Sequence, residues 1–160
     1  MTILYRIFSF IISFFAFFIA LALLILVPIS LAVPPLWFPV FLFAAIVLYT
    51  WFSIKVQRLV FIRHVVVRAS LKDWVKVNGY VAIVFSILNI QPMLALLKNP
   101  DTYIASMKEA MKQLGPQYQQ NFNTHTAVIM SVVMIVYLIV LFAHVLWTFA
   151  LIKKHEEHFQ

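Results

Sequence analysis

The stretch IFSFIISFFAFFIALALLILVPISLAVPPLWFPVFLFAAIVLYTWFSI, residues 7–54, decides the fold class. It lies between Arg6 and Lys55 and runs for 48 residues without one Asp, Glu, Lys or Arg. A helix needs only about 20 such residues to cross a bilayer, so this stretch is long enough to cross twice. As one helix it would be about 72 Å long, more than twice the ~30 Å of the hydrocarbon core. The stretch therefore predicts two transmembrane helices.

Four prolines mark the turn between these two helices. Each removes a backbone donor and disfavours helix in the preceding residue, and all fall within twelve residues: Pro28, Pro34, Pro35 and Pro39. We expect the first span at about residues 7–31 and the second at about 36–54. Trp37, Tyr49 and Trp51 then lie near the ends of the second span, where aromatic residues are enriched.

A cleaved signal peptide is an alternative interpretation of the first span, because residues 30–32 offer small side chains at the spacing of a cleavage site. However, the apolar run of about 25 residues exceeds the ~7–15 residues of a signal peptide. Only Arg6 and the amino terminus supply positive charge before it. These features favour a retained span.

The composition of the whole chain agrees with a membrane protein. Of 160 residues, 64% are apolar and 11% are charged, whereas soluble domains average roughly 45–50% and about 25%. The absence of cysteine excludes disulfides, thiolate metal sites and cysteine nucleophiles. The net charge of +7 does not indicate nucleic-acid binding, because the twelve Lys and Arg residues are distributed by loop.

A basic segment at residues 55–76 follows the second span, and we interpret it as a cytoplasmic loop. Six Lys and Arg residues are opposed there only by Asp73. Ser70 and Asp73 have the spacing of a capping box, which predicts a helix that begins at Leu71 and continues into a third span at about residues 77–97. Four of the basic residues are candidates for contact with anionic lipid headgroups: Arg58, Arg63, Arg68 and Lys72.

The polar segment at residues 98–125 predicts a short amphipathic helix outside the membrane. Asn99 is a suitable N-cap, Pro100 suits the first helical position, and Gly115 with Pro116 is a stop signal. Apolar residues recur there at the spacing of one helical face: Ile104, Met107, Met111 and Leu114. A fourth span at about residues 127–152 follows, and Lys153 and Lys154 end it.

The distribution of basic residues predicts the orientation, since short loops rich in Lys and Arg stay in the cytoplasm. With both termini inside, nine basic residues lie inside and three outside. The inside set is Arg6, the six of residues 55–76, Lys153 and Lys154, and the outside set is Lys98, Lys108 and Lys112. We therefore expect one transmembrane domain over residues 1–160, an all-α four-helix bundle in a bacterial inner membrane. Residue 65 and the end of the chain would face the cytoplasm, and residue 118 the outside.

Polar residues within the spans are the candidate functional residues, because such groups usually face protein or a water-filled cavity. In the fourth span, five of them lie within about 40° of one line: Thr126, Tyr137, His144, Thr148 and His155. Tyr49, Ser53, Gln57, His64 and Arg68 form a comparable face if the second helix continues past the membrane, and Asn78, Ser86 and Asn89 form one in the third span. Gly79 is isolated, although Ala82 and Ser86 could let a neighbouring helix approach.

Six of these residues form the candidate polar seam, namely His144, Tyr137, Thr148, Asn89, Ser86 and Ser53. One interpretation is a set of interhelical hydrogen bonds, and the other is a wall facing a ligand or a proton path, with His144 as the titrating group. In either case His144 is expected to point into the bundle. A hydroxyl or amide such as that of Ser53 or Asn89 would be its partner.

The sequence predicts neither an enzyme nor a cofactor, because no phosphate-loop, hydrolase or zinc-protease signature occurs. His64 and His144 are too far apart along their helices to share a haem, which leaves only a haem between the His144 residues of two copies. His155 and His158, beside two glutamates, could bind a divalent metal, but we expect a frayed, solvated tail there.

Two function classes remain open. The first is an accessory or structural membrane protein that packs in the bilayer against itself or against a larger membrane complex. The second is a carrier or sensor that binds a small molecule or a lipid through the polar seam around His144. Architecture alone does not choose between them.

Overall fold

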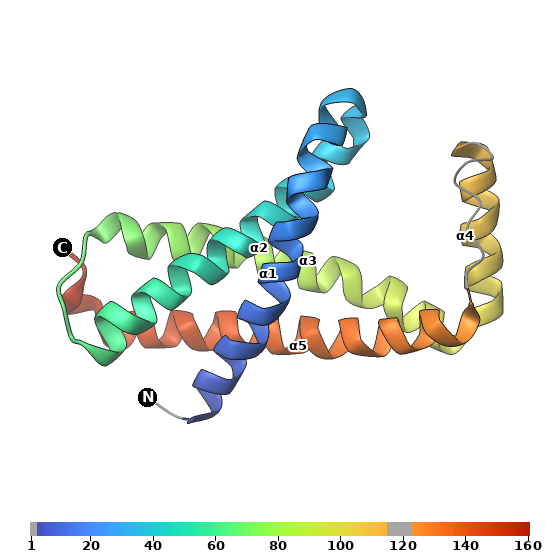
Figure 1. Ribbon diagram of the computed structural model, residues 1–160. Coiled ribbons are helices and arrows are strands. Elements are labelled where there is room, and N and C mark those ends of the chain that lie inside the picture. Colours follow the sequence, from blue (N-terminus) through green and yellow to red (C-terminus); the bar gives the residue numbers. More distant parts are fainter. Residues whose placement is uncertain (1–2, 115–122) are drawn as a thin grey trace. The chain divides into compact units, whose positions relative to one another are not determined.

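The computed structural model describes the backbone of residues 3–114 and 123–160, and over these residues the chain is all-α. Figure 1 shows its five α-helices: α1 (Ile3–Ala32), α2 (Trp37–Val56), α3 (Ala69–Lys98), α4 (Pro100–Leu114) and α5 (Thr124–Lys154). Four segments of the described chain are long and apolar enough to cross a membrane: α1, Pro34–Ile62 with α2, α3 and α5. The predicted all-α class and the predicted number of long apolar helices are confirmed.

The turn predicted at the proline cluster lies between α1 and α2, which form a hairpin (Figure 1). Val33 leaves the helical conformation with φ −127° and ψ 85°, and Pro34–Leu36 form one 3-10 turn. Pro39 is the third residue of α2, in the first turn of the helix, where a missing N–H group costs no hydrogen bond.

The second helix continues past the predicted end of its span at residue 54, but it is not an α-helix throughout. After Val56 it changes to a π-helix at Gln57–Ile62, in which hydrogen bonds run between residues five apart. The helix then ends, and His64 has a φ of 53°, in the left-handed region that non-glycine residues adopt uncommonly. His64 and Arg68 therefore do not extend the helical face of Tyr49, because the continuous helix on which that prediction depended ends at Ile62.

The end of the chain is ordered against the link between α2 and α3, not frayed as predicted. The Val67 N–H donates to the His158 carbonyl at 2.8 Å, and the Gln160 N–H donates to the Val67 carbonyl at 3.0 Å. The Ala69 N–H donates to the Gln160 carbonyl at 2.9 Å. Phe159 is buried between these bonds. The pairing is non-local, so a local reading of the sequence could not reveal it.

The chain divides into two compact units. Unit 1 combines the chain up to Ser86 with Val140–Gln160, and unit 2 is Ile87–Ile139. Helices α3 and α5 contribute one part to each unit.

Unit 1 is held together by aromatic contacts between its helices. Phe8 of α1 meets Trp147 of α5 with ring centroids 6.3 Å apart, and Phe52 of α2 stacks on Trp74 of α3 at 5.7 Å. Gly79 of α3 lies directly against Phe149 of α5. Each of the four helices therefore contacts at least one other in this unit.

In unit 2, α4 and α5 each begin directly after an asparagine. The Asn99 carbonyl accepts from the Tyr103 N–H at 3.1 Å, so α4 begins at Pro100 as predicted. The Asn123 side chain accepts from the His125 N–H at 2.9 Å, which caps α5. Because of this cap, α5 begins at Thr124, three residues before the predicted start of the fourth span. The predicted stop signal at Gly115 and Pro116 lies outside the described residues.

Helix α3 also begins earlier than the capping box predicted, at Ala69 and not at Leu71. The Leu71 N–H donates to the Arg68 carbonyl at 3.0 Å, so the first turn forms before the predicted start. Residues 69–76 of the predicted loop are thus helical, and of that loop only residues 63–68 lie outside helices.

Candidate functional site

His144 lies at the centre of a buried polar cluster in unit 1, as its predicted inward orientation requires. Its side chain is 1% exposed. Nε2 lies 3.0 Å from the Ser9 hydroxyl of α1, and Nδ1 lies 2.8 Å from the Tyr49 hydroxyl of α2. The Tyr5 ring of α1 stacks on the imidazole with centroids 4.7 Å apart. His144 therefore links α5 to both helices of the hairpin.

Thr148, one turn further along α5, is the second centre of this cluster. Its hydroxyl donates to the His144 carbonyl at 2.7 Å, which uses its single hydrogen. The same oxygen accepts from the Tyr49 hydroxyl at 3.0 Å, and it lies 2.9 Å from the Tyr5 hydroxyl, which must therefore be the donor. Thr148 thus ties both tyrosines to α5.

Counting hydrogens assigns the tautomer of a neutral His144. The Ser9 hydroxyl donates to the Tyr5 carbonyl at 2.9 Å, so it has no hydrogen left for the imidazole. Nε2 must then carry the hydrogen and donate to Ser9. Nδ1 is left as an acceptor for the Tyr49 hydroxyl. The Tyr49 oxygen lies 2.8 Å from Nδ1 and 3.0 Å from the Thr148 oxygen, so these two acceptors share its one hydrogen. Every polar side-chain atom of the cluster has a partner.

This arrangement does not fit a haem at His144. An axial imidazole ligand needs a free ring nitrogen for the iron. Both nitrogens of His144 are within hydrogen-bonding distance of side chains of the same chain. The alternative of a haem shared by two copies of His144 would require this cluster to open.

The partners of His144 are hydroxyl groups, as predicted, but they belong to Ser9 and Tyr49 and not to Ser53. Ser53 is buried and donates to the Thr50 carbonyl at 2.9 Å, and Ser86 is buried and donates to the Ala82 carbonyl at 2.8 Å. Both bonds stay within one helix. Tyr137, which is buried, and Asn89, which is half-buried, belong to unit 2.

The sequence reasoning missed Tyr5 and Ser9. With Ser13 they recur at four-residue spacing, which places them within about 80° on α1. The same test for polar stripes that found His144 and Thr148 would have found this set. Tyr5 lies before the predicted start of the first span at Ile7, whereas α1 begins at Ile3, and Ser9 lies within that span.

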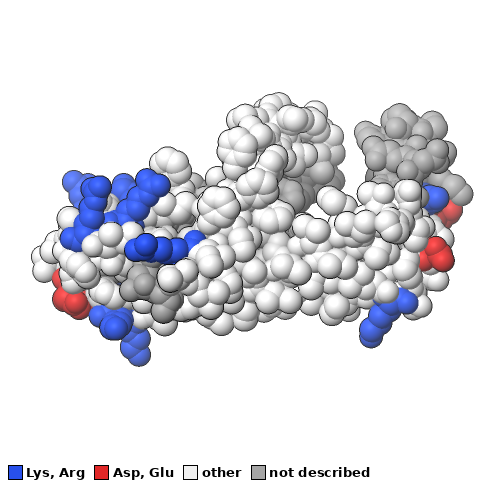
Figure 2. All heavy atoms as spheres, turned by 60° about the horizontal axis from the view of Figure 1, so that its bottom comes forward, with Lys and Arg blue, Asp and Glu red and all other residues white. Residues whose placement is uncertain are grey.

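The candidate lipid-contacting residues lie in unit 1, where Lys and Arg side chains gather around the α2–α3 link and the end of α5 (Figure 2). Arg58 and Arg63 line one groove, and Arg68 lines another. Lys72 instead forms an ion pair with Glu156 at 3.1 Å. This pair lowers the pKa of the Glu156 carboxyl, so its small contribution to stability is present at neutral pH and is lost as the pH falls through that lowered value.

Three histidines meet beside this ion pair. The rings of His64, His155 and His158 lie 5.8 to 6.2 Å apart, centroid to centroid. His155 Nδ1 donates to the Leu151 carbonyl at 2.9 Å, and His158 Nδ1 lies 3.2 Å from a Glu157 carboxylate oxygen. Among the described residues, no group of three or more His, Asp or Glu is placed to hold a metal ion.

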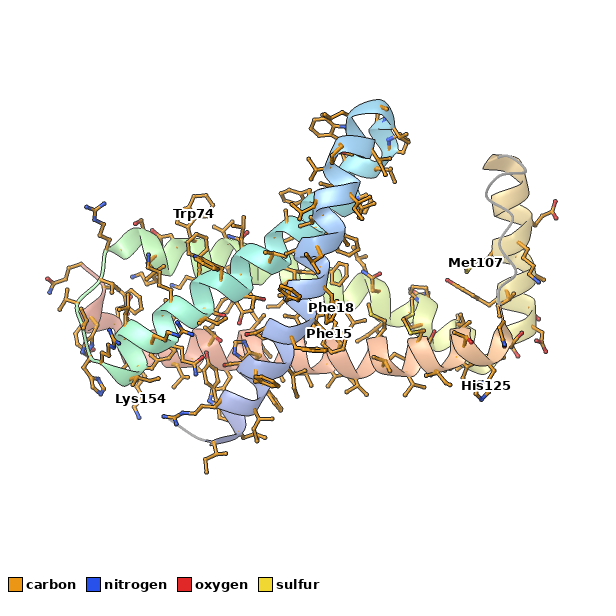
Figure 3. All side chains as sticks on the ribbon, in the orientation of Figure 1. Phe15, Phe18, Trp74, Met107, His125 and Lys154 are labelled. Carbon is orange, nitrogen blue, oxygen red and sulfur yellow. The ribbon has the colours of Figure 1, made fainter. Side chains whose placement is uncertain are left out.

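Unit 2 contains a cavity of about 480 Å³ between α3, α4 and α5. Four of its lining residues are methionines, namely Met93, Met107, Met130 and Met134. Figure 3 shows Met107 on the side of α4 that is turned toward α3 and α5. Flexible thioether side chains fill irregular apolar gaps. Ile104 and Met107 of the predicted apolar face line this cavity, and the side chains of Met111 and Leu114 lie outside the described residues.

Comparison of the chain with protein-family models, with curated proteins and with solved structures finds no match.

Proposed function

We propose that this chain is an accessory or interaction protein of the membrane in which the His144 cluster has a structural role. The observation that carries the proposal is the complete pairing of the cluster. His144 and Thr148 bond to Ser9, Tyr5 and Tyr49 of two other helices. A polar group in hydrocarbon is costly unless it has a partner, and hydrogen bonds of this kind hold membrane helices together.

The surface of the hairpin supports an interaction role. Phe10, Phe14, Phe17 and Phe18 of α1 are each more than half exposed. In a bilayer such an aromatic face is covered by lipid tails or by another helix. Lipid, a second copy of the chain and a larger membrane complex are the candidate partners.

A carrier or sensor that uses His144 is the second candidate. It is favoured by the Tyr49 hydroxyl, which has His144 Nδ1 at 2.8 Å and the Thr148 hydroxyl at 3.0 Å. If Nδ1 gained a proton, this hydroxyl could rotate and donate to Thr148 while accepting from the imidazole. The cluster would then remain fully paired in both protonation states.

Substitution His144→Leu separates the two candidates. A structural role predicts a loss of about 1–2 kcal/mol of stability in detergent, since two interhelical bonds are removed at roughly 0.6 kcal/mol each and the packing changes. The measurement is a thermal melt of the purified protein, with His125→Leu as the control because His125 is exposed at the start of α5 (Figure 3). An unchanged melting temperature would favour the sensor.

We also propose that the protein lies in a bacterial inner membrane with both termini in the cytoplasm. The support is the excess of nine basic residues over three in the inside set. In this orientation α4 lies outside, and its apolar face with Ile104 and Met107 is turned to the rest of unit 2.

The orientation is tested with single cysteines, for which the cysteine-free chain is a clean background. Val65→Cys and Ser106→Cys both replace exposed residues. In intact cells a membrane-impermeant maleimide should label residue 106 and not residue 65, while both should react in lysed cells. Labelling of residue 65 in intact cells would reverse the proposed orientation.

A further inference from the structure

A groove of about 470 Å³ lies beside the end of α2 in unit 1. One part of its lining is apolar and the other is cationic. The apolar residues are Trp51, Ile54 and Leu59, and the cationic residues are Lys55, Arg58 and Arg63.

The π-helix explains why these three cations share one groove. In an α-helix, residues five apart point about 140° away from each other. In a π-helix the hydrogen bonds join residues five apart, so such residues return to the same side. Arg58 and Arg63 are five apart across the segment Gln57–Ile62, and both line the groove. Single π-turns of this kind are frequent at functional sites.

The cations of the groove have no acidic partner within the described residues. The chain has five Asp and Glu residues, and none of them lines the groove. Lys72, by contrast, is paired with Glu156 at 3.1 Å. The groove thus keeps three positive charges available to an anion.

The position of the groove along α2 suits an amphiphile. Trp51 is 69% exposed and lies seven residues before Arg58, which corresponds to about 10 Å along a helix. Trp51 and Ile54 belong to the apolar part of a segment long enough to cross a membrane, and the arginines lie in its last turns and just past its end. A phospholipid has the same order along the membrane normal, because its acyl chain lies deeper in the bilayer than its headgroup phosphate.

We propose that this groove binds one anionic phospholipid. The phosphodiester lies against Lys55, Arg58 and Arg63, with the two guanidinium groups donating to its oxygens. An acyl chain lies along Trp51 and Ile54. The proposal rests on the membrane location of the chain and is independent of the structural role of His144.

A neighbouring groove of about 450 Å³ supplies the control. It shares Lys55 and Leu59 with the first groove and contains Arg68 as its other cation. Removal of Arg68 there, together with Lys154 outside both grooves, tests whether lipid binding depends on the first groove or only on the total charge. The matched variants are Arg58→Gln with Arg63→Gln, and Arg68→Gln with Lys154→Gln, each of which removes two exposed cations.

The experiment titrates the purified protein in detergent with phosphatidylglycerol or phosphatidylcholine and counts retained lipids by native mass spectrometry. The Arg58/Arg63 variant should bind phosphatidylglycerol about 30-fold more weakly, from the loss of two cation contacts. The control variant should change by less than about threefold, and Arg58→Lys with Arg63→Lys should retain most of the binding, because the charge is kept.

Three outcomes would overturn the proposal. Equal losses in the two double variants would mean that only surface charge matters. Equal binding of phosphatidylcholine would exclude selection of an anion. Full competition by inorganic phosphate at millimolar concentration would show that the groove binds a free anion and not a lipid.

The acyl-chain contact is tested separately. Trp51→Ala should weaken lipid binding, whereas Trp37→Ala, at the other end of α2, should not. The reverse result would exclude the acyl-chain contact.

Discussion

Substitution Thr148→Val is expected to lower the free energy of unfolding by about 1–3 kcal/mol, the cost of leaving a buried hydroxyl without an acceptor. Val keeps the shape of Thr, so no cavity forms. Tyr49 retains His144 Nδ1 as its acceptor at 2.8 Å. Tyr5 is fully buried and loses the Thr148 oxygen at 2.9 Å to which it donates. The cost therefore arises mainly at Tyr5.

The partner substitution Tyr5→Phe makes this explanation testable. Alone, it removes one interhelical hydrogen bond and should cost roughly 0.6 kcal/mol. In the Thr148→Val background it also removes the stranded hydroxyl, so the double variant should be more stable than Thr148→Val alone. Thermal or denaturant unfolding in micelles measures all four proteins of the cycle. Strictly additive losses would show that Tyr5 and Thr148 are not coupled.

The fold class could be predicted because the signals that decide it are local. Residues 7–54 are too long for one crossing and too apolar for water, and the prolines between the two halves place the turn. The predicted positions of helix starts were less accurate where a single side chain determines the start. Asn123 caps α5, which therefore begins at Thr124, three residues before the apolar run, and hydrophobicity contains no signal for that cap.

The polar cluster could be predicted only in part. The spacing of His144 and Thr148 placed both on one face of α5, and both are buried. Their partners on α1 and α2 depend on how the hairpin packs against α5, which no helical spacing encodes. The π-helix at Gln57–Ile62 could not be predicted either. On the assumption of 3.6 residues per turn throughout, His64 lies on the same helical face as Tyr49. The groove between Arg58 and Arg63 follows from that change of helix type.

Gly79 shows how a residue that seems isolated in sequence becomes a close contact in the structure. A Cβ atom at this position would lie 2.7 Å from Phe149 Cζ and 3.2 Å from Val145 Cγ1. Small residues at such positions let two helices approach closely. Gly79 therefore sets the distance between the parts of α3 and α5 that belong to unit 1.

Substitution Gly79→Leu should destabilise the protein by about 1–3 kcal/mol, the usual cost of overpacking a well-packed contact. Gly79→Ala should cost less, because the half-buried Phe149 ring is able to turn away and Ala favours helix over Gly by roughly 1 kcal/mol. Val77→Leu, at a position of α3 that is 59% exposed, is the control and should leave the melting temperature unchanged. Combining Gly79→Leu with Phe149→Ala opens space for the new side chain, so the double variant should lose less than the sum of the two single losses. If Gly79→Leu melts like the control, the close approach of α3 and α5 at this glycine is not required for stability.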